Sequence, residues 1–241
     1  MVTLKMAIIF LMEQIRTPFS LIWTIMSPTV LFFFLHFNEI ELHYGDTAWL
    51  GKQISWFVGY ISFSVVLFNY CLYLVGRRES GFIATFVHNM DGRLLFIRSQ
   101  LIASLIISIL YVFFFILVVL TGFQASPDYQ IVMIILKSIY INAFMMVSLT
   151  FMASFRVTFQ TASTIYSVLI TVCMVSGIVS LKYNEGIVYW INQVNPIAIY
   201  STILQSDQEL SLMTIFFYSI MLIISIISAL TFKTEPVWSS Q

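Results

Sequence analysis

Of the chain's 241 residues, 60% are hydrophobic and only 9% are charged, and 11 basic and 11 acidic residues leave no net charge. A water-soluble domain carries about 25% charged residues, so this composition excludes a surface that faces water throughout. It predicts a single all-α, polytopic membrane domain over residues 1–241, and the neutral charge balance gives no indication of a nucleic-acid partner.

Residues 1–17 are predicted to form an amphipathic helix in the inner membrane interface. At about 100° per residue, Lys5, Glu13 and Arg16 fall within an arc of about 80°, whereas apolar residues such as Leu4 and Ile8 lie away from it. The alternative is that this segment is simply the start of the first span. No small-residue cleavage site follows the apolar run, which argues against a secretory signal peptide.

Six long apolar runs predict six transmembrane helices, because each crossing takes about 20 residues. They cover residues 19–37, 54–75, 99–122, 131–155, 162–181 and 210–232. Cytosolic loops collect Lys and Arg, so the basic residues indicate the orientation. With the N-terminus inside, the inner side carries Lys5, Arg16, Arg77, Arg78, Arg93, Arg98, Arg156 and Lys233, and the outer side only Lys52, Lys137 and Lys182. Both termini are therefore predicted to be cytosolic.

Two connections are predicted to be more than linkers. The inner one, residues 77–98, has apolar residues at helical spacing, among them Phe82 and Phe86, and predicts a short amphipathic helix parallel to the membrane. The alternative is a helix that only floats on lipid headgroups. The outer stretch, residues 186–204, is apolar but broken by Asn195-Pro196, and predicts two half-helices that enter the outer leaflet and return. Backbone of this kind is tolerated at depth only where protein or water satisfies its polar groups.

No sequence pattern indicates catalysis or metal binding. The pair Gly51-Lys52 is followed by Gln53, so the chain has no P-loop for ATP, and it has no hydrolase or metalloprotease motif. Neither Cys71 nor Cys173, both inside apolar runs, indicates a disulfide or a metal site. We therefore expect no enzyme activity, cofactor or metal on this chain, and expect any energy to come from a partner.

The order of these features resembles the permease subunit of a type-two ABC exporter. An amphipathic N-terminal helix leads into six spans with both ends inside, and the sequence Arg78-Glu79-Ser80-Gly81 closes the second span. The broken outer hairpin, with Asn195-Pro196-Ile197, precedes the last span. One departure concerns the residues after Gly81, where the family often has threonine and then an acidic residue, and this chain has Phe82-Ile83-Ala84.

The resemblance implies that two permease chains, identical or paralogous, pair in a bacterial plasma membrane. Each would dock a separate cytosolic ABC ATPase, which holds the ATP and Mg. The docking and coupling residues implied on this chain are Arg77, Arg78, Glu79, Ser80, Gly81, Phe82, Phe86 and Arg93. A cavity between the two chains would be lined by Trp23, Trp56, Tyr60, Phe63 and Tyr166, an apolar wall for hydrophobic or amphipathic cargo. Compact permeases of this kind resemble bacterial exporters of small amphipathic or antimicrobial peptides, including the phenol-soluble modulin type.

Two other functions stay open. A channel or secondary carrier without an ATPase would need a charged or polar residue at the middle of the membrane, and we identify none from the sequence. Lys137 lies about 9 Å into the fourth apolar run, and we favour the interpretation that its side chain extends back to the interface. The other alternative is a membrane assembly or immunity protein that transports nothing.

Overall fold

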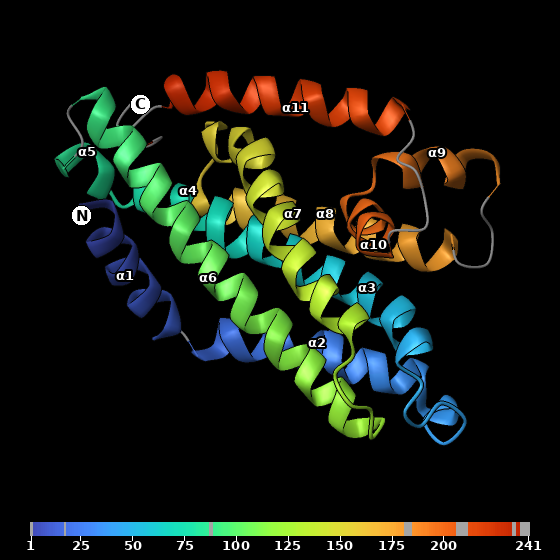
Figure 1. Ribbon diagram of the computed structural model, residues 1–241. Coiled ribbons are helices and arrows are strands. Elements are labelled where there is room, and N and C mark those ends of the chain that lie inside the picture. The colour runs from blue at the N-terminus through green and yellow to red at the C-terminus, as the bar shows by residue number, and fades with distance from the viewer. Residues whose placement is uncertain are drawn as a thin grey trace.

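The computed structural model describes residues 2–16, 18–86, 89–180, 185–205, 212–232 and 235–236. These residues form helices and their connections, and no strand occurs among them (Figure 1). The helices are α1 (Val2–Ile15), α2 (Pro18–Leu35), η1 (Phe37–Glu39), α3 (Thr47–Ser64), the π-helix η2 (Val65–Leu72), α4 (Tyr73–Glu79), α5 (Phe82–Phe86), α6 (Met90–Gly122), α7 (Tyr129–Ser154), α8 (Phe159–Ser180), α9 (Gly186–Val194), α10 (Pro196–Gln205) and α11 (Leu212–Leu230). The prediction of an all-α fold is confirmed.

Four helical stretches in the described part of the chain are long and apolar enough to cross a membrane. They are Thr47–Glu79, in which α3, η2 and α4 are continuous, Met90–Gly122, Tyr129–Ser154 and Phe159–Val179. Several apolar helices of this length fit a membrane protein. Helices α2 and α11 correspond to the other two predicted spans, but their described apolar parts, Thr24–Leu35 and Thr214–Leu230, are shorter. The count of six crossings therefore stays a prediction.

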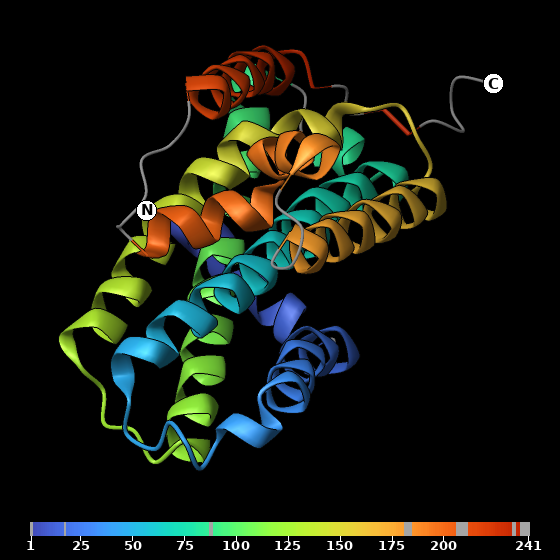
Figure 2. The same ribbon diagram turned by 90° about the vertical axis from the view of Figure 1, so that its right-hand side faces the viewer.

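Helix α7 lies at the centre of the bundle, where it contacts α3, α6, α10 and α11. Figure 2 shows α11 at the outer edge over α7 and α10 against α3. A cluster of aromatic rings joins α2 to α3 and α6, because the ring of Phe32 lies 5.0–6.0 Å from those of Phe57, Phe115 and Phe123. Edge-to-face contacts of this kind add to the stabilisation from burial.

The connections gather at two ends of the bundle. At one end, which we call the α5 end, Ser99 near the start of α6 donates to the carbonyl of Thr3 at 3.1 Å. Arg93, also at the start of α6, donates to the carbonyl of Leu230 at 2.9 Å. The beginning of α1 and the end of α11 therefore lie at the same end of the molecule as α5.

At the opposite end, the beginnings of α3 and α7 meet. The hydroxyl of Thr47 donates to the carboxylate of Asp128 at 3.3 Å, and the N–H of Gly45 donates to the carbonyl of Phe123 at 3.1 Å. The α2–α3 and α6–α7 connections therefore lie together at the end opposite α5 (Figure 1), and the orientation in the membrane stays a prediction.

The inner connection is shorter than the predicted range 77–98. Helix α4 continues into that range and ends at Glu79. Two residues later, Gly81 has a φ of 74°, a value that glycine adopts without strain. Helix α6 begins directly after Asn89, because the side-chain oxygen of Asn89 accepts the Gly92 N–H at 2.8 Å and caps the first turn. Between Gly81 and Asn89, the described residues include one short helix, the five residues of α5.

The outer stretch predicted over 186–204 forms two helices, α9 and α10, that meet at Asn195. The Asn195 amide donates to the carbonyl of Cys173 at 2.8 Å and to the hydroxyl of Ser176 at 3.0 Å, and its oxygen accepts the Ile197 N–H at 3.0 Å. These bonds satisfy backbone and side-chain groups at the break and attach it to α8. Entry of the pair into the outer leaflet stays a prediction.

Helix α10 is a core element. A Cβ added at Gly59 of α3 would lie 2.8 Å from the Tyr200 Cβ and 2.9 Å from the Ile197 carbonyl oxygen, so the two helices touch through a residue without a side chain. On its other side, the Tyr200 hydroxyl donates to the Asn142 side-chain oxygen at 2.7 Å, and the Asn142 amide donates to Ser108 at 2.8 Å. The hairpin therefore packs against α3 and is hydrogen-bonded to α7 and α8, and Asn142 connects it to α6.

Candidate functional site

The side chain of Arg78 holds the end of α7 and the connection that follows it. Arg78 is only 1% exposed, and its guanidinium donates to the carbonyls of Ala153 at 3.1 Å, Phe155 at 2.9 Å and Val157 at 2.9 Å. Its Nε donates to the Glu79 carboxylate at 3.2 Å. The last carbonyls of a helix have no partner within the helix and attract a cation, so this arginine satisfies them. We call this arrangement the Arg78 joint.

Arg77 binds α1 instead. Its guanidinium pairs with the Glu13 carboxylate and donates to the Tyr73 hydroxyl at 2.9 Å, and that hydroxyl donates to Glu13 at 2.5 Å. The guanidinium also lies over the ring of Tyr73 at 5.0 Å and over that of Phe82 at 4.8 Å. Arg77 thereby links α1, α4 and α5 through one cation.

The remaining predicted coupling residues have smaller roles in this end of the bundle. Arg93 caps α11 through the Leu230 carbonyl. Ser80 is exposed and its hydroxyl bonds to the Arg77 carbonyl at 3.0 Å. Nothing lies within 4 Å of a Cβ added at Gly81, so that glycine is required for its positive φ alone. The side chain of Phe86 lies outside the described residues.

The basic segment is therefore used within the chain. Arg77, Arg78 and Arg93 each bind a different element: α1, the α7–α8 connection and α11. Sequence reasoning placed these arginines at a joint with an ATPase, and the structure brings them together at the α5 end. Because Arg78 is buried, its side chain positions the backbone of the α7–α8 connection.

The predicted cavity-lining residues separate into two groups. Trp56 and Tyr60 are half-buried on α3. Phe63 is 1% exposed and Tyr166 is 2% exposed, and the Tyr166 hydroxyl donates to the Met152 carbonyl at 3.0 Å. The structure therefore places Phe63 and Tyr166 in this chain's own core instead of on a wall facing a second chain. The side chain of Trp23 lies outside the described residues.

Helix α8 carries a stripe of hydroxyl side chains that the sequence analysis missed. Thr164, Ser167 and Thr171 are exposed and recur every three or four residues on one face. Each hydroxyl donates to the carbonyl four residues earlier, at 3.1, 2.8 and 2.8 Å. This face lines a shallow hollow of about 420 Å³, and α8 is the least buried of the four long apolar helices. The spacing of Ser and Thr was the available signal.

A buried polar cluster also escaped the sequence analysis. In the π-helix η2 the Asn69 carbonyl accepts hydrogen bonds from the Gln100 amide at 2.7 Å and the Ser104 hydroxyl at 3.1 Å. Asn69, Gln100 and Asn142 are all buried inside predicted spans. Asn142 lies near the middle of the predicted span 131–155, so the expectation that no polar residue occupies the middle of a span is wrong at this position. Short stretches of π-helix are frequent at functional sites, although here the amides hold helices together.

A pocket of about 520 Å³ opens between α3, α7 and α10 near the opposite end of the bundle. Its lining includes Lys52, Tyr129, Gln130, Lys137 and Gln205. Lys137 is half-buried there, close to the beginning of α7, and the extension of its side chain to the membrane interface stays a prediction.

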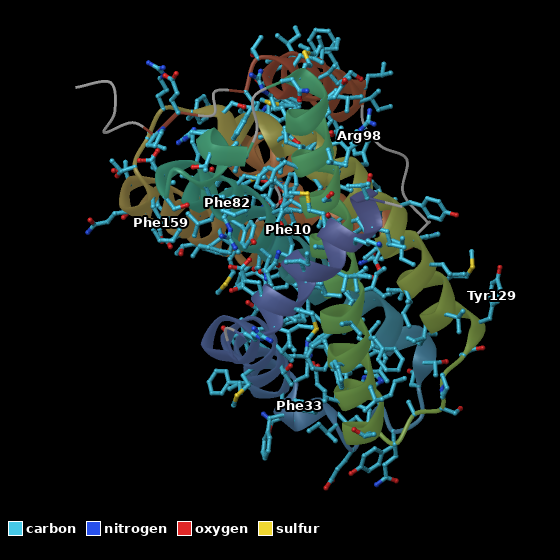
Figure 3. All side chains as sticks on the ribbon, turned by 90° about the vertical axis from the view of Figure 1, so that its left-hand side faces the viewer. Phe10, Phe33, Phe82, Arg98, Tyr129 and Phe159 are labelled. Carbon is cyan, nitrogen blue, oxygen red and sulfur yellow. The ribbon has the colours of Figure 1, made fainter. Side chains whose placement is uncertain are left out.

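No protein-family model matches the chain. Within the described residues, no group of three or more His, Cys, Asp or Glu side chains could hold a metal ion. Figure 3 shows Phe10 of α1 and Phe82 of α5 near one another at the α5 end, where both rings lie against that of Phe96.

Proposed function

We propose that this chain is the membrane-spanning permease subunit of a type-two ABC exporter, which moves hydrophobic or amphipathic cargo out of a bacterial cell. A separate cytosolic ATPase supplies the energy, and a second permease chain completes the transport path. The observation that carries the proposal is the Arg78 joint. It connects α4, which ends beside the short α5, to the residues just before α8.

The joint supports a route for mechanical force. Helix α5 is a one-turn helix between the two longest helical stretches. Ser80, which precedes it, and Thr85, which lies within it, are both exposed. A displacement of α5 by a docked ATPase passes to α4 through the backbone and through Arg77 over Phe82. From α4 it passes through Arg78 to the α7–α8 connection and then to α8.

The hydroxyl stripe supports a role for α8 at the end of this route. Small hydroxyl residues allow close packing between membrane helices, and hydroxyls that bond back to their own helix tolerate both lipid and polar surroundings. We infer that the face with Thr164, Ser167 and Thr171 borders the path between two chains, with Trp56 and Tyr60 on neighbouring α3. Movement of α8 would then widen or narrow that path.

The test is ATP hydrolysis by the assembled complex. The purified chain in lipid vesicles is expected to hydrolyse no ATP. Purification of the tagged chain from its own cells is expected to recover a separate ABC ATPase in a stable complex, with hydrolysis that cargo stimulates. Absence of any such ATPase from the purified complex, together with ion or solute flux by the chain alone, would favour a channel or carrier. Absence of both complex and flux would favour a protein that does not transport.

A further inference from the structure

We propose that the α7–α8 connection, residues 155–158, is a second contact for the cytosolic ATPase, at which Arg156 meets an acidic patch. This inference rests on the proposed function and names a contact that the resemblance did not assign. It makes the docking surface composite, with α5 as one part and the connection as the other.

The connection is held in one conformation from its inner side. Arg78 binds the carbonyls of Phe155 and Val157, and the Val157 N–H donates to the Phe155 carbonyl at 2.9 Å. At the far end, the Thr158 hydroxyl accepts the Thr161 N–H at 3.3 Å and caps α8. With both flanking carbonyls turned to Arg78, Arg156 is the exposed residue between them. No hydrogen bond or ion pair joins its guanidinium to any described residue.

The surroundings of Arg156 have the composition of a protein contact. Phe155 is 53% exposed and Phe159 is 49% exposed, so Arg156 lies in the chain between two accessible aromatic residues. Arginine and aromatic residues are enriched where proteins bind one another.

This patch lies close to α5. Helix α4 contacts both the patch and α5. A Cβ added at Gly76 of α4 would lie 3.2 Å from the Phe159 ring, and the guanidinium of Arg77 lies over the Phe82 ring of α5. Figure 3 shows Phe82 and Phe159 near one another at the same end of the molecule, with Phe33 at the other. One rigid partner can therefore contact both.

The fixed backbone favours a protein partner over lipid headgroups. The buried guanidinium of Arg78 holds the connection in place through the carbonyls of Phe155 and Val157. Burial of a guanidinium is costly unless its donors are used. Mobile headgroups would accept an arginine on a loop of any conformation, whereas a protein partner gains affinity from a contact that is already ordered. An acidic patch on the ATPase is the complement of the single free cation on this connection.

The first experiment places the photo-crosslinker p-benzoylphenylalanine at Arg156, at Thr85 on α5 and at Arg98 on α6, one position at a time, in the full chain in cells. After irradiation, adducts are identified by mass spectrometry. We expect positions 85 and 156 to cross-link a protein with a P-loop, and position 98, which is exposed on the side of α6, to cross-link lipid only. A P-loop adduct at 85 without one at 156 would overturn this inference alone. Absence of the adduct at both positions would overturn the proposed function as well.

The second experiment tests the charge. Arg156→Gln is expected to weaken the affinity of the purified ATPase for the permease in vesicles a fewfold, and Arg156→Glu by about tenfold or more, because it faces the acidic patch with a like charge. Arg156→Lys and the matched Arg98→Gln variant should leave the affinity near wild type. Equal affinities for Arg156→Glu and wild type would overturn the contact. Equal losses for Arg156→Gln and Arg98→Gln would assign the effect to general surface charge and overturn it too.

Discussion

Arg78 donates to the carbonyl of Val157, 79 positions further along the chain, at 2.9 Å. This bond joins the end of one long apolar helix to the beginning of another. Because the guanidinium is buried and forked, it binds the carbonyls on both sides of a bend at once, which a shorter or unbranched cation does less well.

Replacement of Arg78 is expected to destabilise the protein. Arg78→Met removes the donor to three carbonyls and one of the partners of Glu79. Loss of one partner from a buried charged network costs about 3–5 kcal/mol. Arg78→Lys keeps the charge but not the fork and should cost less. Thermal unfolding in detergent measures both, with Arg98→Met as the exposed control. A melting temperature for Arg78→Met equal to that of the control would show that the joint contributes nothing to stability.

Two glycines of α3 are expected to respond in opposite directions to alanine. At Gly59 the added methyl meets Tyr200 and backbone at 2.8–2.9 Å, so Gly59→Ala must separate α3 from α10 and should cost about 1–3 kcal/mol. At Gly51 the nearest atoms are 3.7 Å away, and Gly51→Ala should stabilise by up to about 1 kcal/mol through helix propensity. Parallel unfolding curves of the two variants test the pair. A loss of stability in Gly51→Ala as large as that in Gly59→Ala would contradict the close approach at Gly59.

Gly81 is expected to be sensitive to the shape of the backbone and not to the volume of the side chain. Its φ of 74° lies in the left-handed region, and open space surrounds an added Cβ. Gly81→Val should therefore cost more than Gly81→Asn, because Asn adopts this conformation more readily. Both variants should insert into the membrane, and ATPase binding should fall further for Val. Equal binding by the two variants would indicate that the turn plays no part in docking.

A pH effect is expected from the cap of α3. The Trp49 N–H donates to the Asp46 carboxylate at 3.0 Å and His43 lies 3.2 Å away, and these two contacts, the first above all, hold the pKa of Asp46 below its usual value of 3.8. A carboxyl whose pKa is lower in the folded state stabilises the fold at any pH above its unfolded-state pKa. This contribution disappears as the pH falls through the folded-state pKa. Between about pH 5 and about pH 3, wild type should therefore lose more stability than Asp46→Asn. Parallel losses would assign the change to other carboxyls.

The ends of the outer hairpin are expected to share one side of the membrane. Single cysteines at Glu185 and Gln205, in a chain with Cys71 and Cys173 replaced by alanine, should both react with an impermeant maleimide added outside cells. This follows from the two short helices that turn back at Asn195. Reaction of only one position from outside would mean that the stretch crosses the membrane.

The sequence alone determined the all-α class, the approximate position of each long helix and the interruption at Asn195. These follow from local properties: apolar runs, glycines, and a proline that lacks an N–H. The gathering of basic residues between the second and third apolar runs was also evident from the sequence, because charge is costly inside a bilayer.

Only the tertiary structure decided what those residues contact. It showed that Arg78 is buried against a distant connection, that Phe63 and Tyr166 belong to the core, and that Asn69, Gln100 and Asn142 bond to neighbouring helices. Sequence periodicity separates polar from apolar faces, but in a chain that is apolar on every face it does not distinguish lipid from protein. Which face meets another helix depends on packing between residues far apart in the sequence, and that information exists only in three dimensions.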